Sequence, residues 1–148
     1  MAASAWQLYN YAKRYIGNGT IELGVGNFKM ALFTSASNAS TFTLSTFASL
    51  TSEISATGGY TSGGKALVPA TGQWTVGASA KQMKFTYSAI GLTFTASGSS
   101  LSNIKYAVIY QSGGKLLCFC QLSSSQFSVA SPNTLTVLPA ATGIFTLT

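Results

Sequence analysis

Two short stretches place a serine near a lysine at a spacing that could support nucleophilic chemistry. They are Ser62-Gly63-Gly64-Lys65 and Ser112-Gly113-Gly114-Lys115. A serine nucleophile needs an adjacent base, and the chain has no His for that role. Neither stretch matches the phosphate-binding pattern Gly-x-x-x-x-Gly-Lys-Ser/Thr. Paired glycines followed by a lysine are typical of tight turns, and we interpret both stretches in that way.

Carboxylate chemistry has few residues to draw on. The chain has two acids, Glu22 and Glu53, and no Asp. Glu22 alternates with Ile21 and Leu23, so we expect it to point to solvent, whereas Glu53 lies in an irregular Ser/Thr-rich segment. A paired-carboxylate glycosidase or a calcium loop is therefore not expected. We predict that the protein is not an enzyme and binds no metal and no cofactor.

Cys118 and Cys120 lie in the sequence Leu-Leu-Cys-Phe-Cys-Gln. Residues two apart on a strand point to the same face, with Cα atoms near the upper limit for a disulfide. A metal site would need further Cys or His ligands. We predict two reduced thiols on either side of Phe119, packed as small apolar groups, which fits assembly inside a reducing cell.

The composition predicts one domain over residues 1–148 that makes extensive surface contacts. The chain is 47% hydrophobic and only 7% charged, against about 25% charged in typical domains. Such a surface has few charges to keep copies apart, so we expect contacts with copies of the chain or with a scaffold. The alternative is a monomer with a hydroxyl-rich surface.

Partners of other kinds are not expected. The net charge is +6, but the lysines are spread along the chain and form no dense basic patch, which argues against nucleic acid binding. No continuous apolar run reaches the roughly 18 residues of a membrane span, and the first residues do not resemble a signal peptide.

One helix is predicted, over residues 4–16. Ser4 is a candidate N-cap, and Lys13 and Arg14 fall in the last turn, where the helix dipole favours cations. The sequence Gly17-Asn18-Gly19 ends the helix. The helix could plug one end of the fold, or it could dock onto a partner with Trp6, Tyr9 and Lys13 or Arg14 facing outward.

The remainder, residues 20–148, predicts a β-sandwich. Ten or so short strands separated by Gly, Pro and Ser favour an all-β, antiparallel, jelly-roll-like sandwich with one N-terminal helix. A helical turn is expected near residues 46–50 and a hairpin turn at 112–114. The predicted strands are 20–23, 28–33, 65–68, 73–76, 82–87, 92–95, 104–110, 115–122, 127–129, 133–138 and 144–147.

Aromatic residues are the remaining candidates for recognition. They could pack in the core, anchor a protein interface or line a carbohydrate-binding face. The carbohydrate candidates are Tyr60, Trp74, Tyr87, Tyr106 and Tyr110. The predicted partner-interface residues are Trp6, Tyr9, Lys13, Arg14, Tyr60 and Trp74.

Several motifs, in order along nearly the whole chain, resemble a family of small structural virion proteins of tailed bacteriophages. The residues that carry this resemblance are Ala5-Trp6-Gln7-Leu8-Tyr9-Asn10 with Lys13, Gly19-Thr20-Ile21-Glu22-Leu23, Phe28-Lys29-Met30-Ala31-Leu32-Phe33-Thr34-Ser35, Gly59-Tyr60-Thr61-Ser62-Gly63-Gly64, Tyr106-Ala107-Val108-Ile109-Tyr110 and Gly143-Ile144-Phe145-Thr146-Leu147. Family members carry more Asp than this chain, so the resemblance assigns no acidic or ion-binding role here.

The resemblance implies a capsid decoration or cement protein. Such a protein would be made in the host cytoplasm, lie on the capsid exterior of the virion, and bridge and stabilise subunits of the major capsid protein, as a homo-oligomer on the particle. The alternative is a tail- or fibre-associated virion protein that binds a host-surface glycan, which would need an exposed aromatic shelf.

Overall fold

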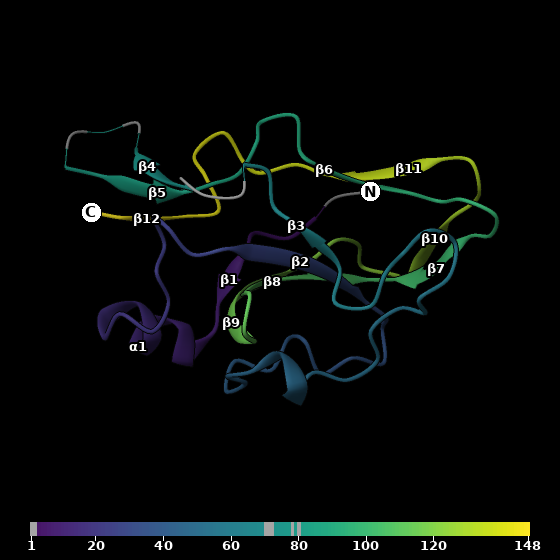
Figure 1. Cartoon of the computed structure of the whole chain (residues 1–148), viewed down its shortest axis with the longest axis horizontal. Helices are drawn as coiled ribbons and strands as arrows, with labels where there is room; N and C mark the ends of the chain where they lie inside the picture. The colour runs from purple at the N-terminus through teal and green to yellow at the C-terminus, as the bar shows by residue number, and fades with distance from the viewer. Residues whose placement is uncertain (1–2, 70–72, 78, 80) are drawn as a thin grey trace.

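The structure, a computed structural model, describes residues 3–69, 73–77, 79 and 81–148 (Figure 1). Most of the elements are short antiparallel strands. They are, in chain order, β1 (Gln7–Leu8), α1 (Asn10–Gly17), β2 (Phe28–Phe33), the 3₁₀ turn η1 (Phe47–Ser49), β3 (Lys65–Ala66), β4 (Trp74–Val76), β5 (Met83–Phe85), β6 (Leu92–Thr95), β7 (Leu101–Ile104), β8 (Tyr106–Gln111), β9 (Lys115–Gln121), β10 (Phe127–Val129), β11 (Thr134–Val137) and β12 (Phe145–Leu147).

The main sheet contains five strands in the order β1-β9-β8-β2-β3, and all neighbours are antiparallel. Its central strands are buried on both faces, because β2, β8 and β9 have nearly continuous runs of buried residues. Strands covered on both faces have continuous apolar sequences rather than alternating ones. The runs Tyr106–Tyr110 and Leu116–Cys120 follow this pattern.

An upper layer covers one face of the main sheet (Figure 1). It consists of the three-stranded sheet β12-β5-β4 and the two-stranded sheet β11-β6. The rings of Phe28 and Phe85 join the two layers, with centroids 5.0 Å apart. Both side chains are almost fully buried, so this edge-to-face pair lies at the centre of the core.

A lower layer of α1 and the long segment between β2 and β3, including η1, covers the opposite face (Figure 1). Phe119 of β9 contacts Tyr9 and Phe42, with ring centroids 5.1 and 5.3 Å apart. Phe47 of η1 stacks on Tyr110 of β8 at 4.3 Å. The irregular segment is therefore ordered by the aromatic side chains that it places on the sheet.

The predicted all-β, antiparallel fold with a single short helix is confirmed for the described residues. The turn predicted near residues 46–50 is η1, and the glycines at 112–114 connect β8 to β9 as a hairpin. The jelly-roll connectivity and the single domain over residues 1–148 stay predictions.

The predicted N-terminal helix over residues 4–16 is wrong in its first half. Helix α1 begins only at Asn10, and its N-cap is Tyr9 rather than Ser4. Ser4 instead pairs with the edge of β9, since its N–H donates to the Gln121 carbonyl at 2.8 Å and its Oγ accepts from the Gln121 N–H at 3.0 Å. Strand β1 continues this pairing. The open edge of β9 outweighs the local helical preference of this segment.

The strand predicted at residues 20–23 is also wrong. These residues form turns after α1, and the N–H of Ile21 donates to the carbonyl of Tyr15 at 3.0 Å. Ile21 and Leu23 are buried and Glu22 is exposed, so the predicted alternation of burial is correct. That alternation arises from a turn packed on the core rather than from a strand in a ladder.

Candidate partner surfaces

Two of the predicted interface residues, Tyr9 and Tyr60, lie in the core. Tyr9 is fully buried, and its hydroxyl donates to the carbonyl of Ala39 at 2.6 Å. Tyr60 is almost fully buried between Glu53 and the backbone of Leu32. Neither side chain offers surface to a partner in this fold, so their expected outward position is corrected.

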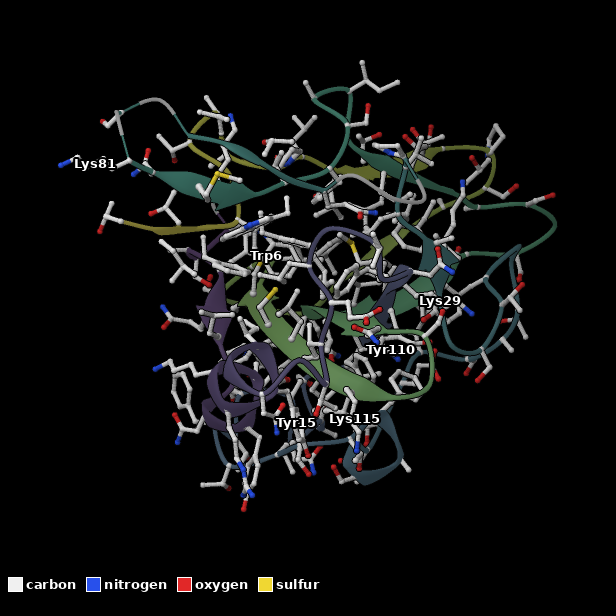
Figure 2. All side chains as sticks on the ribbon, turned by 60° about the vertical axis from the view of Figure 1, so that its left-hand side comes forward. Trp6, Tyr15, Lys29, Lys81, Tyr110 and Lys115 are labelled. Carbon is white, nitrogen blue, oxygen red and sulfur yellow. The ribbon has the colours of Figure 1, made fainter. Side chains whose placement is uncertain are left out.

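Trp6 and Trp74 are half-buried. Trp74 in β4 packs against Phe145 of β12, with ring centroids 6.1 Å apart. Trp6 lies between the upper layer and the main sheet (Figure 2). It lines an apolar groove of about 570 Å³ together with Cys120, Leu122 and residues 135–140 and 142–144. Trp6 therefore packs between the layers, whereas Trp74 packs within the upper sheet and against the core.

Lys13 and Arg14 are exposed on α1, as the interface prediction requires. Ala12 faces the sheet and is fully buried, which turns the neighbouring residues of the helix outward. Tyr11 is 40% exposed on the same side of the helix as Arg14, and its ring lies 6.0 Å from that of Tyr15, one helical turn further on. The outer side of α1 thus combines cationic and aromatic groups.

A lysine from the main sheet extends this surface. Nζ of Lys115, at the start of β9, lies 5.0 Å from the centroid of the Tyr15 ring (Figure 2). A cation over an aromatic face at this distance is stabilised by the ring quadrupole, by about 0.5–1 kcal/mol at an exposed site. We call Tyr11, Lys13, Arg14, Tyr15 and Lys115 the α1 surface.

The upper layer carries a second, apolar surface. Most of the strongly exposed large apolar side chains belong to segments that form or border this layer. They are Val68, Val76, Ile90, Leu138 and Leu147. Ile90 is 83% exposed and Val76 is 73% exposed. Grouped exposure of this kind marks contact surfaces more often than isolated exposed residues do.

The register of the three-stranded sheet explains part of this exposure. Val76, Met83 and Leu147 are direct partners across β4, β5 and β12, so their side chains share one face. The next row on that face contains Phe85, which is fully buried against the main sheet. The inward apolar face therefore continues beyond the part of the sheet that the core covers.

Glu53 is held inside an internal hydrogen-bond network. Its carboxylate accepts from the Tyr60 hydroxyl at 2.7 Å, the Ser62 hydroxyl at 3.0 Å and the Gly63 N–H at 2.6 Å. The Tyr60 hydroxyl accepts in turn from the Leu32 N–H at 3.0 Å. Burial, together with the bond to Glu53, raises the pKa of Tyr60 well above its usual value. This carboxylate anchors a loop to the edge of β2.

The two Ser-Gly-Gly-Lys stretches are turns, as predicted. Gly63 and Gly64 both have positive φ, and Gly64 lies so close to the Met30 carbonyl that a side chain would clash with it. In the second stretch, the Gly114 carbonyl accepts from the Phe47 N–H at 2.7 Å. Gly64 therefore lets backbone approach backbone, whereas Gly113 and Gly114 supply the positive φ that the hairpin turn needs.

The cysteines match their prediction. Both are free and buried, on the face of β9 opposite Phe119. Burial raises the pKa of the Cys120 thiol to about 12 and that of Cys118 well above its usual value. Neutral, inaccessible thiols of this kind act as core residues.

The aromatic shelf needed for glycan binding does not form from the predicted residues. Of the five candidates, four are buried: Tyr60, Tyr87, Tyr106 and Tyr110. Within the described ranges, no group of three or more His, Cys, Asp or Glu side chains could hold a metal ion. No helix in the described part of the chain is long and apolar enough to cross a membrane.

No protein family, curated protein or solved structure matches this chain. The two surfaces must therefore be interpreted from their own chemistry. Lys13 and Arg14 could be predicted as interface residues from their place on the predicted helix. Tyr11 and Lys115 were missed, because their grouping depends on how α1 packs against β9.

Proposed function

We propose that the protein is a non-enzymatic structural component of a tailed-bacteriophage particle, a cement protein that bridges neighbouring major capsid subunits. One observation carries the proposal: a well-packed body presents two chemically different contact surfaces in two different layers. The α1 surface lies below the main sheet and the apolar surface lies on the upper layer (Figure 1). A protein that bridges subunits needs two such surfaces on one body.

The arrangement of layers supports this role. The main sheet is covered on both faces and lies between the two layers that carry these surfaces (Figure 1). We take the capsid shell as the partner because the sequence resembles small virion proteins. Binding to the assembled shell, and not to free subunits, would stabilise the shell by mass action. The glycan-binding alternative is not favoured, since most of its expected aromatic residues are buried.

The proposal is tested by heating particles that carry or lack the protein. We expect DNA release at a higher temperature when the protein is present, and density that repeats across the shell lattice. Equal release temperatures, or density found only at the tail vertex, would contradict a cementing role.

A matched pair of variants addresses the apolar surface. Leu147 is half exposed on the apolar face of β12, whereas its neighbour Thr146 points to the opposite side of that sheet. Leu147→Asp should remove the gain in release temperature, because a charge would be desolvated in the contact. Thr146→Asp adds the same charge and should keep most of the gain.

A further inference from the structure

The cations of the α1 surface have no acidic partner within their own element. Helix α1 contains no Asp or Glu, and Lys13 and Arg14 are exposed at adjacent positions. Lys115 adds a third cation, which the Tyr15 ring holds in place. Glu53, one of the two acids of the chain, accepts from neutral donors only in the hydrogen bonds described above. Glu53 therefore does not neutralise this surface.

We propose that the α1 surface binds an acidic patch on a partner protein, with Tyr11 and Arg14 as its central contacts. Tyr and Arg are the residue types that most often dominate binding energy at protein interfaces. Tyr11 and Arg14 are separated by three positions and so lie on one side of the helix. Lys115, held over the ring of Tyr15, adds a cation on this side. Lys13 adds a third one on the flank of the helix next to Arg14. Carboxylates of a partner would neutralise these charges.

A second copy of this chain does not fit this surface. Because the carboxylate of Glu53 already accepts three hydrogen bonds, a copy would offer Glu22 as its exposed acid. One carboxylate cannot balance three cations, and contact between two α1 surfaces would place like charges together. Charge complementarity therefore requires a different protein.

Nucleic acid fits less well than an acidic protein. Single-stranded nucleic acids bind through free aromatic faces on which bases stack, next to a basic groove. Lys115 already lies over the Tyr15 ring, and Tyr11 is tilted by 39° relative to that ring. Lys29 and Lys81, the two other lysines labelled in Figure 2, lie away from Tyr15 and Lys115 and do not extend the surface into a groove.

The test measures binding of the full chain to immobilised poly-L-glutamate as a function of salt, with duplex and single-stranded DNA as parallel probes. The test variant is Lys13→Gln/Arg14→Gln. The matched control is Lys65→Gln/Lys81→Gln, which removes the same charge from exposed positions outside the α1 surface. Circular dichroism and thermal unfolding check that each variant is folded.

We expect the test variant to bind poly-L-glutamate about tenfold more weakly than the wild type, and the control to bind within about twofold of it. Equal losses in both variants would show that only net charge matters, and would overturn the proposal. Tighter binding to DNA than to poly-L-glutamate, lost in the test variant, would also overturn it in favour of a nucleic acid surface.

The inference depends on the proposed function only for naming the shell as the acidic partner. Incorporation of the same variants into particles separates the two. If the wild type is absent from particles but binds poly-L-glutamate through α1, the cement role fails and this inference stands. If the test variant is incorporated and stabilises particles as the wild type does, the inference fails and the cement role stands.

Discussion

Glu53 provides the sharpest test of how the long segment between β2 and β3 is held. The substitution is Glu53→Ala. It removes the acceptor of three hydrogen bonds, two of which, from Tyr60 and Gly63, are partly buried. The third donor, Ser62, is exposed and can bond to water instead. Glu22→Ala is the matched control, because it removes the other carboxylate of the chain from an exposed position.

The magnitude follows from the two partly buried donors. Hydrogen bonds to a charged group contribute about 1.5–3 kcal/mol each, and we take the lower value because the site is partly exposed. The free energy of unfolding should therefore fall by about 3 kcal/mol, out of the 5–15 kcal/mol typical of a domain. For a chain of this size, that corresponds to a decrease of roughly 10 °C in Tm. Glu22→Ala should change the free energy of unfolding by less than about 0.5 kcal/mol.

A double-mutant cycle with Tyr60→Phe identifies the bond between the two side chains. Tyr60→Phe alone breaks that bond and also leaves the buried Leu32 N–H without its acceptor. The double variant should lose about 1.5 kcal/mol less than the sum of the single variants, because both remove the same bond. Urea unfolding at neutral pH measures all four proteins. Additive losses, or equal stability of Glu53→Ala and Glu22→Ala, would refute the assignment of Glu53 as an anchor.

Two further predictions concern a close approach of backbone at Gly64 and the buried thiol of Cys120. Gly64 and Gly98 have nearly the same positive φ, but a Cβ at Gly64 would clash with the Met30 carbonyl whereas Gly98 has open space. Gly98→Ala should thus cost about 1 kcal/mol in urea unfolding and Gly64→Ala several times more; equal costs would refute the close approach. Burial raises the pKa of the Cys120 thiol from about 9 to about 12, because the folded state favours the neutral thiol. The stability that this preference contributes should be complete below pH 9 and be lost as the pH rises toward 12. Circular dichroism should show this loss of stability as the pH is raised. In Cys120→Ala, stability should fall less steeply with pH between pH 9 and pH 12. An unchanged dependence of stability on pH in this variant would contradict the prediction.

Strand positions could be predicted from the sequence where apolar residues form continuous runs. The strands predicted at residues 28–33 and 104–110 correspond to β2 and β8, which are central strands buried on both faces. The short strand Leu92–Thr95 was predicted with the bounds that the structure shows, because Gly91 precedes it and the loop Ser97-Gly98-Ser99-Ser100 follows soon after it. The local sequence is sufficient in such places, because apolar and β-branched residues favour the strand and the turn residues next to them end it.

The N-terminus and the interface residues depend on distant contacts. Ser4 has the chemistry of a helix N-cap, but the nearby edge of β9 offers backbone hydrogen bonds that no local pattern reveals. Tyr9 and Tyr60 have the side chains of interface anchors, and their hydroxyls instead bond to Ala39 and Glu53. An aromatic residue type alone does not distinguish an interface from a core in which the hydroxyl has a partner.

The scarcity of acids has a structural consequence for assembly. The carboxylate of Glu53 accepts hydrogen bonds within the fold and contributes little negative charge to the surface. The exposed surface is therefore more strongly cationic than the net charge of +6 suggests. Copies of the chain on a particle would repel one another wherever their cationic surfaces meet. Under the proposed function, that repulsion favours an arrangement in which each α1 surface faces an acidic partner. Contacts between copies would then use the apolar face of β4, β5 and β12, which is opposite to the side chain of Lys84. Raising the salt concentration should therefore weaken attachment to the shell while strengthening any association between copies.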